Sequence, residues 1–358
     1  MDLIDLYAVI MAGGKGTRFW PLSRGHSPKQ LMPITGDRPM LRATVDRIGA
    51  LVPPERTLVV TGRSHANGVR DILPDLPAEN ILVEPLGRNT APCIGLAAHA
   101  VQKRSPHGIM LVLPADHAIE NQAAFLSLAE QGAGLAAQQD LLVTMGLEAT
   151  RPETGYGYIE PASPNPAVAP ALPVASFHEK PDVETAGRYM NQGFFWNSGI
   201  FIWRAEVILD RIKTLLPDLA EGLSELSSFF GQAEFEAALE RIYPTLPSIS
   251  IDFGVMEKAN GVVVLPAAGI GWSDVGSWTV ASEYWPEEDG CRIKGLALMV
   301  DSQRCQVYSP DRLVTLVGVE DLVVVDTPDA ILICRRDKDQ DVKKAVDALK
   351  EKGRDDLL

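Results

Sequence analysis

The sequence predicts an α/β protein built on a doubly wound, mostly parallel sheet, followed by a small all-β domain. Strand-sized apolar runs alternate with helical stretches through the first half of the chain, which is typical of a parallel sheet covered on both faces. From about Tyr284 onward, short β-rich runs are separated by Asp, Gly and Pro turns. The 358 residues also exceed one average domain. We therefore expect a large domain over residues 1–285 and a small one over residues 286–358.

The expected strands of the large domain's first half are rich in Val, Ile and Leu. They are Leu6–Met11, Thr57–Thr61, Ile81–Glu84, Ile109–Pro114 and Leu141–Gly146. The stretches between them have helical composition and length, namely Met40–Leu51, Ala91–Gln102 and Ala123–Gln139. Asn89 and Thr90 offer an N-cap for the second helix, and Pro92 fits its first turn.

Beyond Thr150 the pattern changes. We expect two strands, Gly155–Glu160 and Val174–Glu179, joined by a Pro- and Ala-rich loop. A third strand, Gly199–Trp203, precedes an amphipathic helical region, Ala205–Tyr243, and a late strand, Val262–Pro266. The small domain is expected to contain four short strands, at Leu296–Val300, Leu313–Val317, Leu322–Val325 and Ile331–Cys334. A charged helix over Asp337–Lys352 is expected to follow them. No internal repeat is found.

Composition and charge exclude several classes of protein. A formal net charge of −14 argues against a general nucleic-acid or membrane-surface binder, so an anionic substrate needs a local cluster of cations. The apolar runs are too short to span a bilayer, and residues 1–11 have no basic segment of the secretory kind. The four cysteines are scattered without a C-x-x-C pair, which favours buried thiols in a reducing compartment. We therefore expect a cytoplasmic protein.

A glycine-rich loop follows the first expected strand. It contains Ala12, Gly13, Gly14, Lys15, Gly16, Thr17 and Arg18. Glycines let backbone N–H groups approach a polyphosphate closely, and Arg18, Arg24 and Lys29 add positive charge nearby. The spacing matches neither a Walker A motif nor the dinucleotide G-x-G-x-x-G. Such a turn by itself is structural about as often as functional, but the three cations favour a phosphate site.

Two further loops follow expected strands. The segment containing Gly87, Arg88, Asn89 and Thr90 comes after the third strand and is able to hydrogen-bond a base edge; a plain capped helix explains it equally well. Asp116 comes directly after the fourth strand, where ligands of open α/β sheets bind, and it suits Mg²⁺. Because the three loops end parallel strands, we expect them to share one edge of the sheet.

The second half of the chain supplies groups that suit a phosphorylated sugar. They are Tyr156, Gly157, Glu179, Lys180 and Asn197, which offer ring stacking, hydroxyl hydrogen bonds and a cation. Each alone is also explained by a turn or a salt bridge. Asp274 is the expected second Mg²⁺ ligand, with an Asx-type turn as the alternative.

Taken in order from about residue 7 to residue 280, these segments resemble one family. They resemble the mannose-1-phosphate guanylyltransferases, which are sugar nucleotidyltransferases. The segments that carry the resemblance are AGGKGTRFWPLSR, SPKQ, EPLGRNTAP, LPADH, GYGYIE, HEKP, WNSGIF, IDFGVMEK and WSDVGSW. The resemblance implies a Rossmann-like catalytic domain. The family's C-terminal β-helix resembles residues 286–358 only in texture.

The resemblance also implies substrates and roles. The substrates are GTP and mannose 1-phosphate, joined by in-line attack on the α-phosphorus with Mg²⁺ as cofactor. Arg18, Lys29, Asp116, Lys180 and Asp274 form the catalytic set, with both aspartates on the metal. The resemblance places the nucleotide on two loops, at Ala12, Gly13, Gly14, Gly16, Thr17, Gly87, Arg88, Asn89 and Thr90, with Arg18 and Lys29 on its phosphates. It places the sugar phosphate on Tyr156, Gly157, Glu179, Lys180 and Asn197. We expect a homodimer, and neither nucleic acid nor a membrane as partner. Another sugar or base, such as glucose 1-phosphate, a non-catalytic nucleotide-sugar sensor and a scaffold role stay open as alternatives.

Overall fold

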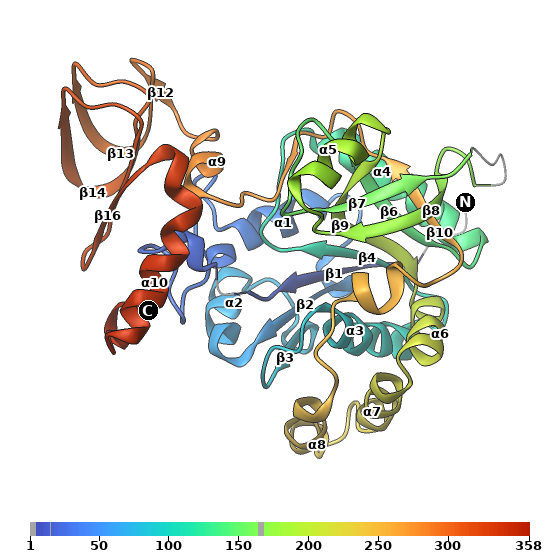
Figure 1. The fold of residues 1–358 in the computed structure, drawn as a ribbon. Helices are drawn as coiled ribbons and strands as arrows, with labels where there is room; N and C mark the ends of the chain where they lie inside the picture. The colour runs from blue at the N-terminus through green and yellow to red at the C-terminus, as the bar shows by residue number, and fades with distance from the viewer. Residues whose placement is uncertain (1–4, 15, 164–167) are drawn as a thin grey trace.

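Nine strands form the central sheet of the large domain in the computed structural model, which describes residues 5–14, 16–163 and 168–358 (Figure 1). Their order across the sheet is β3-β2-β1-β4-β9-β6-β10-β8-β7. The strands are β1 (Leu6–Ala12), β2 (Thr57–Gly62), β3 (Ile81–Glu84), β4 (Ile109–Pro114), β6 (Leu142–Glu148), β7 (Gly157–Pro161), β8 (Leu172–Glu179), β9 (Phe195–Arg204) and β10 (Val262–Pro266). Each strand predicted for the large domain is therefore present.

The first four strands are parallel, as predicted, whereas the rest of the sheet is mixed. β9 lies between β4 and β6 and runs antiparallel to both. Two strands that are close in sequence are thus separated in the sheet by a strand from later in the chain. β10 runs parallel to β6, and β7 and β8 form an antiparallel pair. The loop predicted over residues 161–173 includes residues 164–167, which lie outside the described residues.

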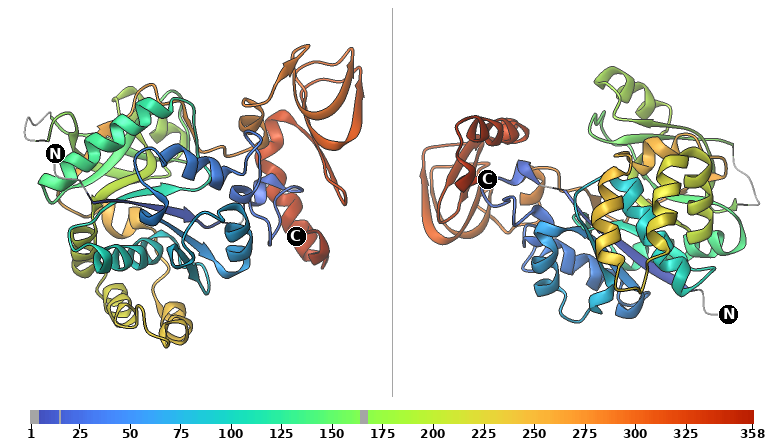
Figure 2. Two further views of the ribbon diagram at one scale, coloured as in Figure 1. Left: turned by 180° about the vertical axis from the view of Figure 1, so that it is seen from behind. Right: turned by 90° about the horizontal axis from the view of Figure 1, so that it is seen from below.

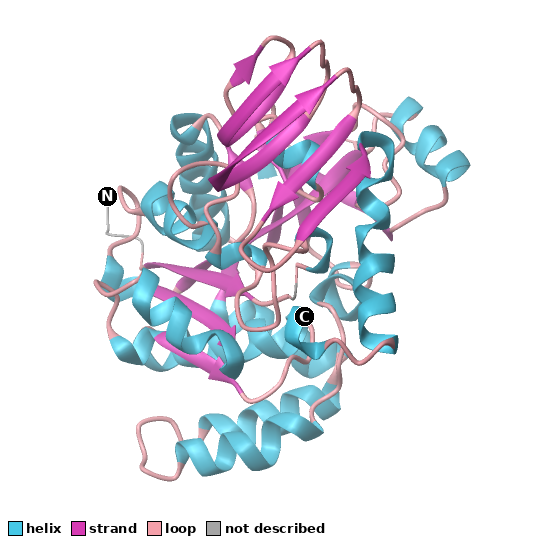
Figure 3. Ribbon diagram, turned by 90° about the vertical axis from the view of Figure 1, so that its left-hand side faces the viewer, coloured by secondary structure: helices cyan, strands magenta, loops and turns pink. Residues whose placement is uncertain are grey.

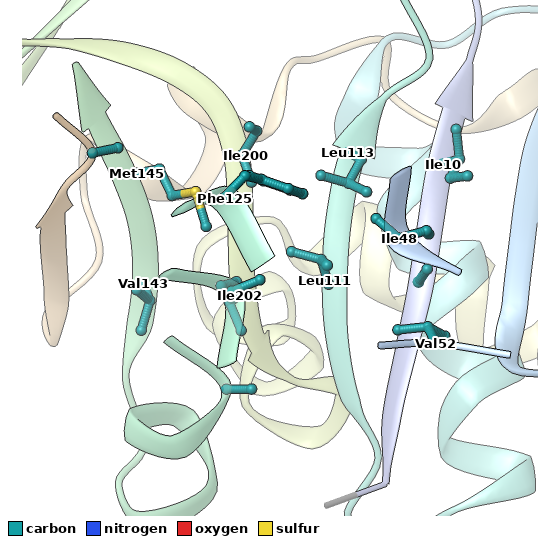
Figure 4. Close-up of a cluster of buried hydrophobic side chains, with 14 of the residues drawn as sticks. Ile10, Ile48, Val52, Leu111, Leu113, Phe125, Val143, Met145, Ile200 and Ile202 are labelled. Atoms are coloured by element: carbon teal, nitrogen blue, oxygen red, sulfur yellow. The ribbon is translucent and has the colours of Figure 1, made fainter. Parts of the chain in front are cut away.

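Helices cover both faces of the sheet, which confirms the doubly wound arrangement (Figure 2). They are α1 (Met40–Ile48), α2 (Ala66–Ile72), α3 (Thr90–Arg104), α4 (Gln122–Gln138), α5 (Val183–Asn191), α6 (Ala205–Leu215), α7 (Pro217–Ser227) and α8 (Phe235–Ile242). Alternate residues of β1 enter opposite cores. Ile10 packs in the core that contains Ile48 of α1 and Phe125 of α4 (Figure 4), whereas Val9 lies in the core of α3, α6, α7 and α8. The sequence did not predict α2 or α5.

The C-terminal β domain is a five-stranded sheet with the order β12-β13-β14-β15-β16 (Figure 3). The strands are β12 (Glu287–Glu288), β13 (Cys291–Val300), β14 (Gln306–Val317), β15 (Leu322–Asp326) and β16 (Ile331–Arg335). The two inner pairings are parallel and the two outer ones antiparallel. The helix predicted over residues 337–352 is divided into a 3-10 segment, η9 (Arg336–Asp341), and α10 (Val342–Glu351).

A third hydrophobic core joins the two domains. Phe19, which follows the glycine-rich loop, packs with Trp278 of the short helix α9 (Trp278–Ser282), and Tyr308 and Val342 of the C-terminal β domain complete the cluster. The indole Nε1 of Trp20 donates a 2.8 Å hydrogen bond to the carbonyl of Leu357. The end of the chain is thereby anchored beside the loop. Within the described part of the chain, no helix is both long and apolar enough to cross a bilayer, and all four cysteines are free thiols.

Candidate active site

The three loops predicted to share one edge of the sheet do so. They follow β1, β3 and β4, which are parallel members of one sheet with β2, so their carboxyl ends open on the same side. This is the edge where ligands of open α/β sheets bind.

The glycine-rich loop is shaped by Gln30, a buried residue of the 3-10 segment η2 (Lys29–Leu31). The amide Nε2 of Gln30 donates hydrogen bonds of 3.1 and 3.2 Å to the carbonyls of Ala12 and Gly13. Gly16 has a φ of 55°, and a Cβ there would lie 2.7 Å from the Cβ of Lys29. Gly16 is thus required both by its conformation and by the close approach of Lys29. Gly13 and Gly14 are exposed, and Lys15 lies outside the described residues.

Lys29 joins the two aspartates predicted to bind metal. Its ammonium Nζ lies 2.9 Å from Oδ2 of Asp116 and 2.7 Å from the main-chain carbonyl of Asp274. A two-stranded pairing makes this possible, because β11 (Trp272–Ser273), just before Asp274, pairs with β5 (Ala118–Ile119), just after Asp116. Burial is the strongest single influence on Asp116 and opposes its ionisation, but the contributions of Lys29, His117 and a backbone hydrogen bond together outweigh it and lower the pKa of the carboxyl. Asp116 is therefore an ionised carboxylate.

The carboxylate of Asp274 is held by Tyr156 and lies close to the backbone of Gly276. Oδ1 accepts a 2.7 Å hydrogen bond from the hydroxyl of Tyr156. A Cβ on Gly276 would be 2.9 Å from Oδ2 of Asp274 and 3.3 Å from Nη1 of Arg18. Arg18 therefore lies close to Asp274, and its Nη1 also donates to Oε1 of Gln340 in the C-terminal β domain at 3.2 Å.

The two aspartates have the side-chain chemistry of magnesium ligands. Within the described residues no cluster of three or more His, Cys, Asp or Glu side chains is arranged to hold a metal by itself. Mg²⁺ does not need one, since it is commonly bound by one or two carboxylates together with substrate phosphates. Asp116 and Asp274 supply that number of carboxylates, and Asp274 lines a cavity at this edge of the sheet.

A cavity of about 250 Å³ opens beside Asp274. Its lining includes residues predicted to bind the sugar phosphate, one residue of the loop predicted to read the base, and one residue from later in the chain: Tyr156, Gly157, Glu179, Asn197, Thr90 and Asp252. Gly157 leaves room for Glu179, because a Cβ there would lie 2.4 Å from Oε2 of that carboxylate. Lys180 is exposed and its Nζ lies 2.8 Å from Oε1 of Glu179, so its charge lies beside the cavity.

The loop predicted to read the base is a capped helix start. Asn89, with a φ of 67°, is the N-cap of α3, as predicted, and its side chain accepts from the N–H of Thr90. The hydroxyl of Thr90 accepts a 2.8 Å hydrogen bond from the N–H of Ile251. The guanidinium of Arg88 donates to the carbonyl of Pro244, so this side chain braces the loop against the segment after α8. Gly87 and Asn89 are exposed.

Three residues of the site carried no predicted role. Gln30 and Asp252 lie in the segments SPKQ and IDFGVMEK, so the motifs marked their neighbourhoods, but nothing in the sequence indicates what they contact. Trp272 donates through Nε1 to Nδ1 of His117 at 3.1 Å. Burial lowers the pKa of His117 to about 4. His117 is therefore a neutral residue that supports the wall of the cavity.

Comparison with known proteins agrees with this architecture. A nucleotidyl transferase family model matches residues 7–285, and a model of the mannose-phosphate isomerase/GMP-like β-helix domain matches residues 295–349. A mannose-1-phosphate guanylyltransferase of Escherichia coli is 40% identical over 98% of this chain and 75% of its own length. One from Salmonella typhimurium is 42% identical over 99% of this chain and 75% of its own length. The chain belongs to the mannose-1-phosphate guanylyltransferase family.

Solved structures extend the comparison. A Thermus thermophilus protein described as a mannose-1-phosphate geranyltransferase superposes with a TM-score of 0.86 and 34% identity, covering 97% of this chain and all of the other. A glucose-1-phosphate thymidylyltransferase homologue from Bacillus anthracis shares only the fold, with 16% identity and a TM-score of 0.53 over 78% of this chain and 93% of its own. The fold class and the family expected from the sequence are thereby confirmed.

Proposed function

We propose that the protein transfers GMP from GTP to α-D-mannose 1-phosphate, giving GDP-mannose and pyrophosphate. One observation supports the proposal: the ammonium of Lys29 donates to the carboxylate of Asp116 and to the main-chain carbonyl of Asp274, beside a cavity whose polar groups suit a sugar. The names of the curated relatives support the same reaction.

The chemical difficulty is that two polyanions must meet. Two like unit charges about 4 Å apart repel by about 4 kcal/mol at an effective dielectric constant of 20, and the reaction brings several such pairs together. Arg18 and Lys29 stand beside the glycine-rich loop, and Lys180 stands beside the cavity. In this proposal the glycine-rich loop, Arg18 and Lys29 bind the triphosphate. Lys180 exchanges its ion pair with Glu179 for one with the phosphate of the sugar.

No side chain needs to act as a nucleophile, because the phosphate of the sugar is already ionised. An oxygen of that phosphate attacks the α-phosphorus in line with the departing pyrophosphate. The protein contributes positioning and charge stabilisation. Tyr156 and Lys29 fix Asp274 from two directions, so the acceptor side of the site is organised before the substrates bind.

Mg²⁺ is the proposed cofactor, held by Asp116 and Asp274. When bound, it neutralises phosphate charge and orients the phosphate oxygens. The guanine base is assigned to the loop of residues 87–90, which adjoins the cavity through Thr90. A cytoplasmic homodimer stays part of the proposal, and analytical ultracentrifugation at several protein concentrations tests the assembly.

A pyrophosphate-release assay tests the function. GTP and ATP are each offered with mannose 1-phosphate and with glucose 1-phosphate, with and without Mg²⁺. We expect release to be fastest with GTP and mannose 1-phosphate and to require the divalent ion. Equal kcat/KM for GTP and ATP would reject the assignment of the base, and a preference for glucose 1-phosphate would reject the assignment of the sugar.

A further inference from the structure

Asp252 is a carboxylate of the cavity to which neither the motifs nor the mechanism assign a role. It is the first residue of η8 (Asp252–Met256), a π-helical turn, and such turns are frequent at functional sites. The backbone around it is anchored to the start of α3: the N–H of Ile251 donates to Oγ1 of Thr90, and the carbonyl of Ile249 accepts from the N–H of Ala91 at 3.1 Å. Asp252 is thereby fixed between the loop of residues 87–90 and the cavity that it lines.

One oxygen of Asp252 is engaged by Asn197. Oδ1 accepts a 2.9 Å hydrogen bond from Nδ2 of Asn197. The amide of Asn197 is oriented by two donors on its own oxygen, the hydroxyl of Thr144 at 3.3 Å and the N–H of Gly199 at 3.2 Å. Since the oxygen side of the amide is occupied, its NH₂ group must face Asp252. A chain of polar groups therefore leads from the sheet to this carboxylate and holds it in place.

The carboxylate of Asp252 keeps acceptor capacity for a ligand. Among the described residues it accepts hydrogen bonds from Nδ2 of Asn197 and from its own backbone N–H, and Asp252 lines the cavity together with Glu179 and Asn197. A carboxylate has only acceptors to offer, and the hydroxyls of a hexose are donors that match it. Burial, with the nearby charge of Glu179, raises the pKa of Asp252 to about 6, so the group is ionised at neutral pH and accepts strongly.

We propose that Asp252 accepts a hydrogen bond from a ring hydroxyl of the hexose and so determines which sugar 1-phosphate is used. This inference rests on the proposed function, because it concerns the sugar of that reaction. A site built to hydrogen-bond a substrate hydroxyl rejects analogues that lack the group, since its own buried acceptor is then left unpaired.

The test is a coupling experiment between the protein and the sugar. Wild type and Asp252→Asn are compared with mannose 1-phosphate and its 2-, 3-, 4- and 6-deoxy analogues, using GTP and pyrophosphate release. Asparagine keeps the size and the bond to Asn197 but turns a donor toward the sugar. We expect kcat/KM for mannose 1-phosphate to fall about 10- to 100-fold in the variant. We also expect one deoxy analogue to be discriminated by the wild type and not by the variant.

Glu257→Gln is the matched control, because Glu257 is an exposed carboxylate just after the same turn that does not line the cavity. It should leave the deoxy pattern unchanged. A uniform loss across all analogues in Asp252→Asn would overturn the inference while leaving the proposed function in place. If the wild type fails to use mannose 1-phosphate, the proposed function fails and the inference with it. Asp252→Glu, which keeps the charge but moves it by one methylene, replaces the asparagine variant if that one melts below the assay temperature.

Discussion

Replacing Asp116 by asparagine tests the connection between stability and activity at the centre of the site. The ammonium of Lys29 donates hydrogen bonds to the carboxylate of Asp116 at 2.9 Å and to the main-chain carbonyl of Asp274 at 2.7 Å. The side chain of Lys29 is 6% exposed, whereas that of Asp116 is 35% exposed. Asp116→Asn keeps the size and one acceptor oxygen but leaves the buried ammonium without its counter-charge.

The burial of the pair sets the expected magnitude. Removing one partner of a fully buried ion pair costs about 3–5 kcal/mol. Because water reaches Asp116, we expect a smaller loss of about 1–3 kcal/mol in the free energy of unfolding. For a chain of this size that loss lowers Tm by about 1–4 °C. Turnover should fall at least about 100-fold, since the site loses a negative group placed for the metal and for Lys29.

Thermal melting and pyrophosphate release on the same preparations measure the two effects. The double variant Lys29→Met with Asp116→Asn is the control, because it removes both charges. Its Tm should recover toward that of the wild type, while its turnover should stay low. Melting at the wild-type temperature together with turnover within about fivefold of wild type in Asp116→Asn would refute the reasoning.

Three further predictions concern side chains around the site. Burial, partly offset by a hydrogen bond from the hydroxyl of Tyr243, raises the pKa of Glu84 from 4.5 to about 7. Because the folded protein then holds this proton more tightly than the unfolded chain, the free energy of unfolding of the wild type should fall by on the order of 3 kcal/mol as pH rises from about 4.5 to 8. Glu84→Gln should lack that fall in urea unfolding at the two ends of the range. Gly157→Ala should displace the carboxylate of Glu179 and raise KM for mannose 1-phosphate about tenfold or more, measured by steady-state kinetics. Tyr156→Phe removes a bond to Asp274 and should lower kcat about tenfold with little change in Tm, measured by the same kinetics and by melting.

The sequence predicted the elements of the catalytic edge well, for a physical reason. Parallel strands place their carboxyl ends together, so Gly13 after β1 and Asp116 after β4 had to lie on one edge once both segments were identified as strands. The residues that cap α3 were also predictable, because Asn89 satisfies a backbone N–H close to it in sequence. Local spacing was sufficient in both cases.

What depends on distant segments was not predictable. The position of β9 between β4 and β6 follows from pairing across the whole sheet, which periodicity within a strand does not encode. The bond from Gln340 to Arg18 crosses 322 residues and needs the packing of the C-terminal β domain. Asp252 reads as an ordinary acidic residue until its bond to Asn197 is seen.

Binding of Mn²⁺ in place of Mg²⁺ tests most directly whether Asp116 and Asp274 hold one cation together. Electron paramagnetic resonance titrations in the presence of GTP would compare the wild type with Asp116→Asn and Asp274→Asn. We expect one ion to bind tightly to the wild type, and each variant to weaken its affinity about tenfold or more. Wild-type affinity in both variants would show that the two carboxylates do not share an ion, and would contradict the proposed arrangement of the site.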